Sequence, residues 1–174
     1  MYDNRNPMLE NDMSAQETRT AFAYLRTSSL TNSDGDSRVR QTEAIMRRAA
    51  AGGLDVKATF ADVVSGAMPA AERPAFAAML DRLEENGTRV VIVEDASRLA
   101  RDLIASETAI LMLIERGVRV LTSSGHDLTD ESDPMKTALR QIAGAFAQAE
   151  KARLVAKLKG ARDRASEAAG KRVE

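Results

Sequence analysis

Ser28 and a set of arginines are the residues of this sequence whose types and spacing could carry out chemistry. Arg26 and Ser28 follow a short apolar run, residues 21–25, that predicts a buried strand. Turn-forming residues come next, so both side chains are expected where a strand opens into a loop. Open α/β sheets place ligand sites at this end of their strands. No histidine lies nearby, which favours a serine nucleophile directed at an anion over a Ser-His-Asp hydrolase.

Two further predicted strands end in polar residues at the same edge. Asp62 and Ser65 follow a half-exposed strand at 56–61. A continuous apolar strand at 90–93 leads into a segment that holds Ser97, Arg98, Arg101 and Asp102. Because the carboxyl ends of parallel strands meet at one edge of a sheet, we expect these side chains to lie around Ser28.

The arginines indicate the class of ligand. A guanidinium stays charged, and its planar fork fits two phosphate oxygens. Arg98 and Arg101 are three residues apart, so they share one face of a helical turn. With Arg26 they could bind a phosphodiester, stabilise a pentacoordinate transition state and ease deprotonation of Ser28. The alternative is that these arginines lie on the surface in ion pairs with Glu94, Asp95 or Asp102.

Helical patterns alternate with the strands that must position these groups. The predicted strands are at 21–27, 56–61, 90–93 and 118–121. The first helix is expected to begin at Asp36 or Ser37, after a loop at 32–36, and to end at Gly52-Gly53. The next is expected to begin near Pro74 and the third after Asp102. This order predicts a three-layer α/β domain with a four- or five-stranded, mainly parallel sheet.

The last element is expected to be one long helix from Met135 to about 169. Its apolar stripe has more surface than a small sheet can cover, so we expect it to pack on a helix of a second subunit. The stripe consists of Leu139, Ile142, Phe146 and Ala149, and the small residues at 143–145 and 147 would allow close approach. The alternative is an ordinary core helix that breaks near Gly160.

The same segment becomes basic after Glu150. Cations in such a run are expected to follow a nucleic-acid backbone, where each one releases counterions. The helix macrodipole would favour the first few cations but does not account for all of them. This predicted arm consists of Lys151, Arg153, Lys157, Lys159, Arg162 and Arg164.

The composition excludes several other classes of protein. The 174 residues are 44% hydrophobic and 29% charged, as in a globular domain. Cysteine is absent, which excludes disulfides and thiolate metal sites and fits a reducing cytoplasm. The one histidine, His126, lies in a polar stretch, and neither a metal nor a cofactor is expected. No apolar run has the length of a membrane span, and the polar residues 1–20 predict a flexible leader.

Taken together, these motifs resemble the N-terminal catalytic domain of the serine recombinases, the resolvase/invertase family. The resemblance covers about 21–164 and rests on the order and spacing of several motifs. They are Tyr24-Leu25-Arg26-Thr27-Ser28, Gln41 on the first helix, Asp62-Val63-Val64-Ser65-Gly66, Glu72-Arg73-Pro74-Ala75-Phe76, Ser97-Arg98-Leu99-Ala100-Arg101-Asp102, and Ala147-Gln148-Ala149-Glu150 with Lys151 and Arg153.

The resemblance implies site-specific strand exchange on double-stranded DNA, without ATP, metal or other cofactor. In the family, four subunits join two DNA sites, each serine forms a 5′-phosphoserine bond, and the strands rejoin after half of the tetramer rotates. This chain would then form a homodimer that assembles into a tetramer, in a bacterial-type cytoplasm and at the nucleoid. Ser28 would be the nucleophile, with Arg26, Arg98 and Arg101. The supporting and phosphate-binding residues would be Gln41, Asp62, Ser65, Arg73, Ser97 and Asp102.

Two features depart from the family pattern. Many members carry an aspartate where this chain has Ser97, so proton transfer is open between Asp95, Asp102 and water. Members usually continue into a DNA-binding domain, and this chain reaches Glu174 where that domain would start. We therefore expect a truncated catalytic module, with a leader at 1–20, a core at 21–134 and a helical arm at 135–174. The alternative is a protein that depends on a partner for the choice of its DNA site.

Alternatives to a recombinase remain at this point. One is a catalytically silent, resolvase-like module that binds DNA or regulates, and the joint presence of Ser28 and the arginines argues against it. The other is a flavodoxin-like domain for a small ligand, which would leave the basic arm without a role. Ser29 is the rival nucleophile, and its spacing from Arg26 fits less well.

Overall fold

A four-stranded sheet lies at the centre of the fold, with all strands parallel and in the order β2-β1-β3-β4. The computed structural model describes residues 19–28, 32–168 and 170. The strands are β1 (Arg19–Thr27), β2 (Leu54–Val63), β3 (Val90–Val93) and β4 (Arg119–Thr122). The predicted parallel α/β sheet is therefore confirmed, with four strands.

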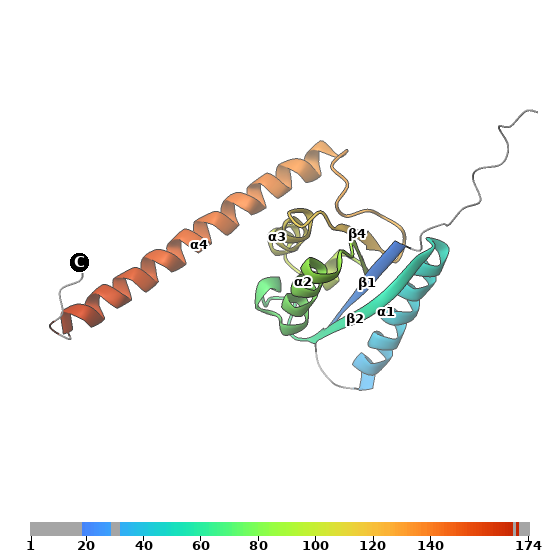
Figure 1. The fold of residues 1–174 in the computed structure, drawn as a ribbon, viewed down its shortest axis with the longest axis horizontal. Helices are drawn as coiled ribbons and strands as arrows, with labels where there is room; N and C mark the ends of the chain where they lie inside the picture. Colours follow the sequence, from blue (N-terminus) through green and yellow to red (C-terminus); the bar gives the residue numbers. More distant parts are fainter. Residues whose placement is uncertain (1–18, 29–31, 169, 171–174) are drawn as a thin grey trace, which may run out of the picture.

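Alternate residues of β1 face two different helical layers (Figure 1). Ala21, Ala23 and Leu25 pack with α1 (Asn32–Ala51) on one face of the sheet. Phe22 and Tyr24 pack on the other face with α2 (Pro74–Asn86) and α3 (Leu103–Ile114). This strand is buried from residue 21 to residue 27, as a central strand covered on both faces must be.

The helix α4 (Pro134–Ala168) packs on α3 near its start and then extends away from the core (Figure 1). Its 35 residues give a length of about 50 Å at the α-helical rise. The residues that face the core are Arg140 and Ala143, both buried, and Gly144, which lies against Leu111. Ile142 and Phe146 of the predicted stripe are 47% and 59% exposed, so most of the expected apolar surface is left open.

Several boundaries differ from the sequence-based expectations. Helix α1 begins at Asn32, so the loop expected at 32–36 is part of the helix. A short 3₁₀ helix, η1 (Ala70–Glu72), precedes α2, and β2 is longer than expected at both ends. The expected long helix, in contrast, is confirmed, since α4 runs past Gly160 without a break. The leader expected at 1–20 lies outside the described residues up to 18, and its last two residues begin β1.

Within the described part of the chain, no helix combines the length and the apolarity that crossing a membrane requires.

Candidate active site

The order in which strands are added to the sheet reverses at β1, and the candidate site lies at that point. The connection through α1 places β2 on one side of β1, and the next connection crosses back to place β3 on the other. The carboxyl ends of β1 and β3 therefore border the crevice where open α/β sheets bind ligands. Ser28 directly follows β1 and is exposed, while its rival Ser29 lies outside the described residues. The 3₁₀ helix η2 (Ala96–Arg98) follows β3.

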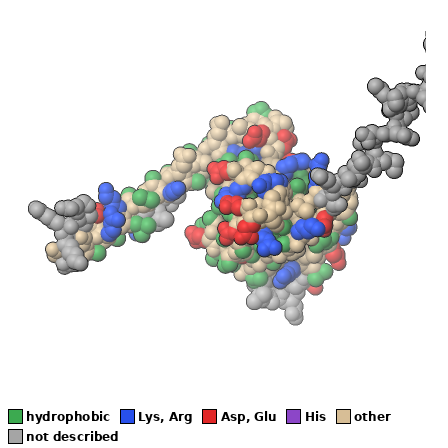
Figure 2. All heavy atoms as spheres, viewed as in Figure 1, with side chains coloured by type: hydrophobic (Ala, Val, Ile, Leu, Met, Phe, Trp, Pro, Cys, Tyr) green, Lys and Arg blue, Asp and Glu red, His purple; other side chains and the backbone are tan. Residues whose placement is uncertain are grey.

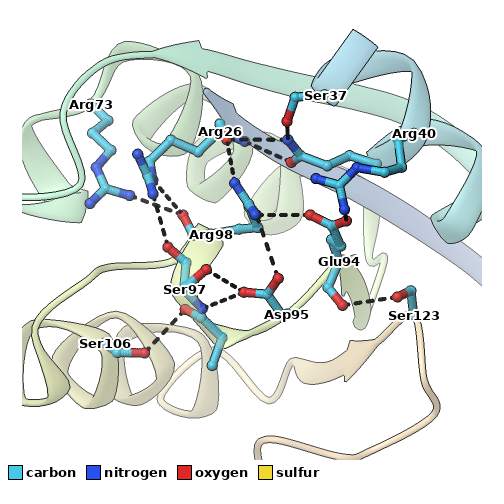
Figure 3. A network of polar contacts seen from close by, with 12 residues as sticks. Arg26, Ser37, Arg40, Arg73, Glu94, Asp95, Ser97, Arg98, Ser106 and Ser123 are labelled. Atoms are coloured by element: carbon cyan, nitrogen blue, oxygen red, sulfur yellow. Dashed lines mark hydrogen bonds and ion pairs between the residues drawn. The ribbon is translucent and has the colours of Figure 1, made fainter. Parts of the chain in front are cut away.

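Arg26 is buried, and its guanidinium binds the loops around the site through main-chain carbonyls (Figure 3). Nε donates to the carbonyl of Arg98 at 3.2 Å and Nη2 to that of Ser97 at 3.0 Å. Nη1 donates to the carbonyl of Val64 at 3.1 Å, beyond the end of β2. These bonds satisfy a charge that would otherwise be costly to bury, and they join the loops after two different strands.

Arg73 is fully buried and also donates to main-chain oxygens. Its Nε and Nη2 bind the carbonyl of Met68 at 3.0 and 2.7 Å. Nη1 binds the carbonyl of Leu99 at 2.5 Å and the hydroxyl of Tyr24 at 3.4 Å. In this conformation Arg73 fastens the loop before α2 to the segment after η2. Direct contact between Arg73 and a phosphate stays a prediction.

Four arginines gather at this crevice. Burial lowers the pKa of Arg26 below its usual value, and the charges of Arg73, Arg98 and Arg101 lower it further. The Arg98 side chain is 20% exposed, and Arg101 is exposed. Because the cations repel one another, an anion bound among them would relieve an unfavourable interaction. The cluster therefore concentrates the positive charge that binding of an anion would require.

Gly66 allows the two arginines Arg26 and Arg101 to approach each other. A Cβ at this buried glycine would lie 2.6 Å from Cγ of Arg101 and 3.1 Å from Nη2 of Arg26. The amide of Arg101 also donates to the carbonyl of Gly66 at 3.4 Å. Any larger residue would displace at least one arginine, so the glycine is part of the site's shape.

Gln41 and Asp62 support the end of β1 from opposite sides. The amide of Gln41, fully buried, accepts from the main-chain N of Arg26 and donates to its carbonyl, both at 3.3 Å. Asp62 pairs with Arg26 in the register of β1 and β2. Its carboxylate accepts from the N–H groups of Ala75 and Phe76 at 2.9 and 3.0 Å, so it caps the first turn of α2.

Asp62 also accepts from the hydroxyl of Tyr24 at 2.9 Å. Burial raises the pKa of Tyr24 far above its usual value, which Arg73 opposes in part. The phenol therefore stays protonated and remains a donor to Asp62. Tyr24, whose side chain ties the β1 end to α2, was in the predicted motif but had no predicted role.

Three other predicted residues make local contacts at the edge of the site. Ser65 is exposed, and its hydroxyl accepts from the N–H of Ala67 at 3.2 Å. Ser97 donates both its N–H, at 2.8 Å, and its hydroxyl to Asp95. Asp102 accepts from the N–H of Ala105 at 3.0 Å and caps α3. Asp95 and Asp102 both act as caps here, and proton transfer by either one stays a prediction.

Comparisons with known proteins identify the family. A family model described as "Resolvase, N terminal domain" matches residues 21–171. The chain belongs to this resolvase family. It is 35% identical over 98 residues to the Transposon Tn501 resolvase of Pseudomonas aeruginosa and, equally, to the Transposons Tn1721 resolvase of Escherichia coli. Each match covers 56% of this chain and 50% of the relative, so the chain spans about half the length of these resolvases.

Solved structures share the resolvase fold. The N-terminal catalytic domain of TP901-1 integrase has a TM-score of 0.60 at 22% identity, over 76% of this chain and 97% of that one. A resolvase family site-specific recombinase from Streptococcus pneumoniae has a TM-score of 0.57 at 17% identity, over 84% and 98%. The predicted family and fold class are therefore confirmed.

The basic arm of this resolvase-family chain is exposed along the second half of α4. All six predicted cations, from Lys151 to Arg164, are exposed. Hydrophobic side chains lie along the same helix (Figure 2), among them Val155 and Leu158, which are 57% and 62% exposed. The arm thus presents cations and apolar groups together.

One acidic residue at the resolvase site was expected only as a possible ion-pair partner of the arginines and was given no role in the site. Glu94 follows β3 directly, and its side chain is 10% exposed with ion pairs to Arg40 and Arg98. Its position at the carboxyl end of a central strand was the available signal, but a single carboxylate there gave no motif. Among the described residues, no group of three or more His, Cys, Asp or Glu side chains is arranged to hold a metal.

Proposed function

We propose that this resolvase-family chain catalyses site-specific recombination of double-stranded DNA, with Ser28 as the nucleophile. The observation that carries the proposal is the cluster of four arginines beside the strand end that bears Ser28. Such a cluster suits a phosphodiester, whose charge rises as a pentacoordinate transition state forms. A module without catalysis would have no use for this arrangement of repelling cations.

The reaction would proceed by two phosphoryl transfers. Ser28 Oγ loses its proton and bonds to phosphorus, and the bond from phosphorus to the DNA 3′ oxygen breaks. The leaving oxygen takes a proton and becomes a free 3′-hydroxyl, while the 5′ end stays attached to the serine. A 3′-hydroxyl from another strand then reverses these steps. Because the phosphoserine keeps the energy of the original bond, no ATP is consumed.

The exposed and the buried arginines would have different roles in the reaction. Arg98 and Arg101 have side chains that reach the surface, so we assign direct contact with the phosphate to them. Arg26 and Arg73 are buried and bound to carbonyls, so they would hold the loops and add positive potential from behind. A low-polarity setting strengthens that potential.

The helix α4 would supply contacts to the DNA backbone and to a second subunit. Its exposed cations suit a DNA backbone, where affinity falls steeply as salt rises. Its exposed apolar groups, including Ile142 and Phe146, suit a second subunit. We therefore propose a homodimer that assembles into a tetramer around two DNA sites.

A covalent trapping assay tests the chemistry. The full chain, fused to a DNA reader of known site, is incubated with a nicked substrate that prevents religation. We expect protein attached to a 5′ DNA end, mapped to Ser28, in the parent chain and in the Ser29→Ala variant. The Ser28→Ala variant should form no adduct. An adduct on Ser29 would overturn the nucleophile, and no adduct from a folded, DNA-bound parent chain would favour the silent module.

A further inference from the structure

Glu94 holds two arginines that come from different elements of the site (Figure 3). Its Oε1 lies 2.5 Å from Nη1 of Arg40 on α1, and its Oε2 lies 3.0 Å from Nε of Arg98 in η2. Its main-chain carbonyl accepts from the Ser123 hydroxyl at 2.9 Å, which fixes the backbone beside β4. A nearly buried carboxylate on a fixed backbone is well placed to orient what it binds.

Two contacts hold the Arg98 guanidinium against the protein. Nε lies 3.0 Å from the Glu94 carboxylate in an ion pair that lacks hydrogen-bond geometry, and Nη1 donates to the carbonyl of Arg26 at 3.3 Å. Arg26 in turn donates to the carbonyl of Arg98, so the two arginines hold each other across the crevice. Asp95 lies farther from Arg98 Nε, at 3.6 Å, and its other oxygen is bound to Ser97. Glu94 is therefore the closer anchor.

The second contact links the same carboxylate to the opposite wall of the crevice. Arg40 precedes Gln41, the residue that holds the main chain of Arg26 from α1. Glu94 thus joins η2 to α1, the helix that follows Ser28 in the chain. This places one carboxylate between the element that carries Arg98 and the element next to the nucleophile.

We propose that Glu94 is a positioning residue that sets the orientation of Arg98 for phosphoryl transfer; this inference rests on the proposed function. A carboxylate beside a phosphate-binding arginine also weakens attraction for the DNA phosphate, because it cancels part of the positive potential. Removing its charge should therefore leave DNA binding as strong as before, or stronger, while the chemical step slows. If Glu94 had only a structural role, its removal would not slow the chemical step while leaving DNA binding intact.

The test compares Glu94→Gln with Glu84→Gln in the trapping assay, using the full chain with its DNA reader. Glu84 makes an ion pair with Arg116, at 2.9 Å, on the exposed surface of α2, so Glu84→Gln controls for the loss of one carboxylate charge. Single-turnover measurements give the rate constant at saturating DNA and the DNA concentration at half that rate. A second readout is the ¹⁵N NMR signal of Arg98 Nε in the free protein, assigned with Arg98→Lys.

We expect Glu94→Gln to lower the rate constant by about 100-fold, the scale of a misplacement of about 1 Å, without raising the half-saturating DNA concentration. The Arg98 signal should shift or broaden in this variant, Glu84→Gln should match the parent chain, and Glu94→Asp should recover part of the rate. If Glu94→Gln does not fold, Glu94→Asp becomes the test variant. We then expect a lower rate constant than in the parent chain, at an unchanged half-saturating DNA concentration.

Three results would overturn the role of Glu94. They are a rate constant within about twofold of the parent chain, an equal loss in the Glu84→Gln control, or a slow variant whose Arg98 signal is unchanged. A parent chain that forms no adduct would refute the proposed function, and the positioning role with it, even if the NMR signal shows the ion pair intact. The two failures are therefore distinguishable.

Discussion

The four arginines of the site place the same guanidinium group in two different settings. Arg26 and Arg73 are buried and use their guanidinium groups to fasten loops, whereas Arg98 and Arg101 reach the surface. All four add positive charge to one crevice, and under the proposed function this prearranged charge would replace the reorganisation that water would need. The four positive charges repel one another, and the bonds to main-chain carbonyls and the ion pair with Glu94 offset this repulsion.

The approach of Arg26 and Arg101 at Gly66 leads to a prediction. Gly66→Ala places a methyl group within 2.6 Å of Arg101 and 3.1 Å of Arg26. Arg26 is held by three carbonyls, so Arg101 must move. We expect trapping to slow about tenfold or more, with unfolding in urea little changed. The control is Gly144→Ala, whose methyl would make an ordinary contact of 3.7 Å with Leu111, and equal losses in both variants would contradict this account.

The residue types at the site could be predicted from the sequence, but their contacts could not. Arg26, Asp62 and Arg98 were expected at one edge because strand ends and residue types are local features. That the guanidinium of Arg26 binds the carbonyls of Val64, Ser97 and Arg98 depends on the shapes of two loops distant in sequence. Glu94 was expected only as an ion-pair partner of the arginines, because its contact with Arg40 arises only when α1 and η2 meet.

At the scale of elements, one buried ion pair fastens α4 to the core. Arg140 Nε lies 3.4 Å from Glu107 Oε2 on α3, with side chains 5% and 12% exposed. Arg140 also donates to the carbonyls of Asp130 and Leu128, in the connection before α4. The start of the long helix is thus held at three points by a single side chain.

Removing this anchor should destabilise the domain. Arg140→Met leaves Glu107 buried without its partner, which costs about 3 kcal/mol or more in comparable pairs. We expect that loss in the free energy of unfolding, measured by urea denaturation. Adding Glu107→Gln should restore part of the stability, because no buried charge is then left unpaired. A loss of less than about 0.5 kcal/mol in the single variant, typical of a surface change, would contradict the anchoring role.

The order of elements could be predicted because apolar runs mark the strands, but two features of the helices could not. Residues 32–36 include Gly35 and other turn formers, yet α1 begins at Asn32; acidic residues such as Asp34 and Asp36 are favoured near a helix start. The face of α4 that contacts α3 consists of Arg140, Ala143 and Gly144. The small residues at 143–145 were expected to allow close approach to a second subunit, but Ala143 and Gly144 face the core of their own chain.

At the scale of the whole molecule, α4 leaves apolar side chains open to a second copy. Phe146 is 59% exposed, and Ile142 is 47% exposed on the same helix. Phe146→Glu should weaken self-association by at least tenfold, because a charge would have to be desolvated at the interface. Sedimentation velocity over a range of protein concentrations measures this.

The matched control for Phe146→Glu is Val39→Glu, which adds the same charge on α1 at a position that is 58% exposed. We expect Val39→Glu to associate like the parent chain. A parent chain that is monomeric at every concentration, or an equal effect of both substitutions, would show that this face of α4 is not the interface.

The attachment of α4 near its start also has a mechanical consequence. From Arg140 to the helix end at residue 168, a rise of 1.5 Å per residue gives a lever arm of about 42 Å. A tilt of about 10° at the α3 contact would therefore move the far end by about 7 Å, roughly the distance between successive phosphates on one DNA strand. A small change in packing near Glu107 would thus produce a large displacement of the cations at the other end of the helix.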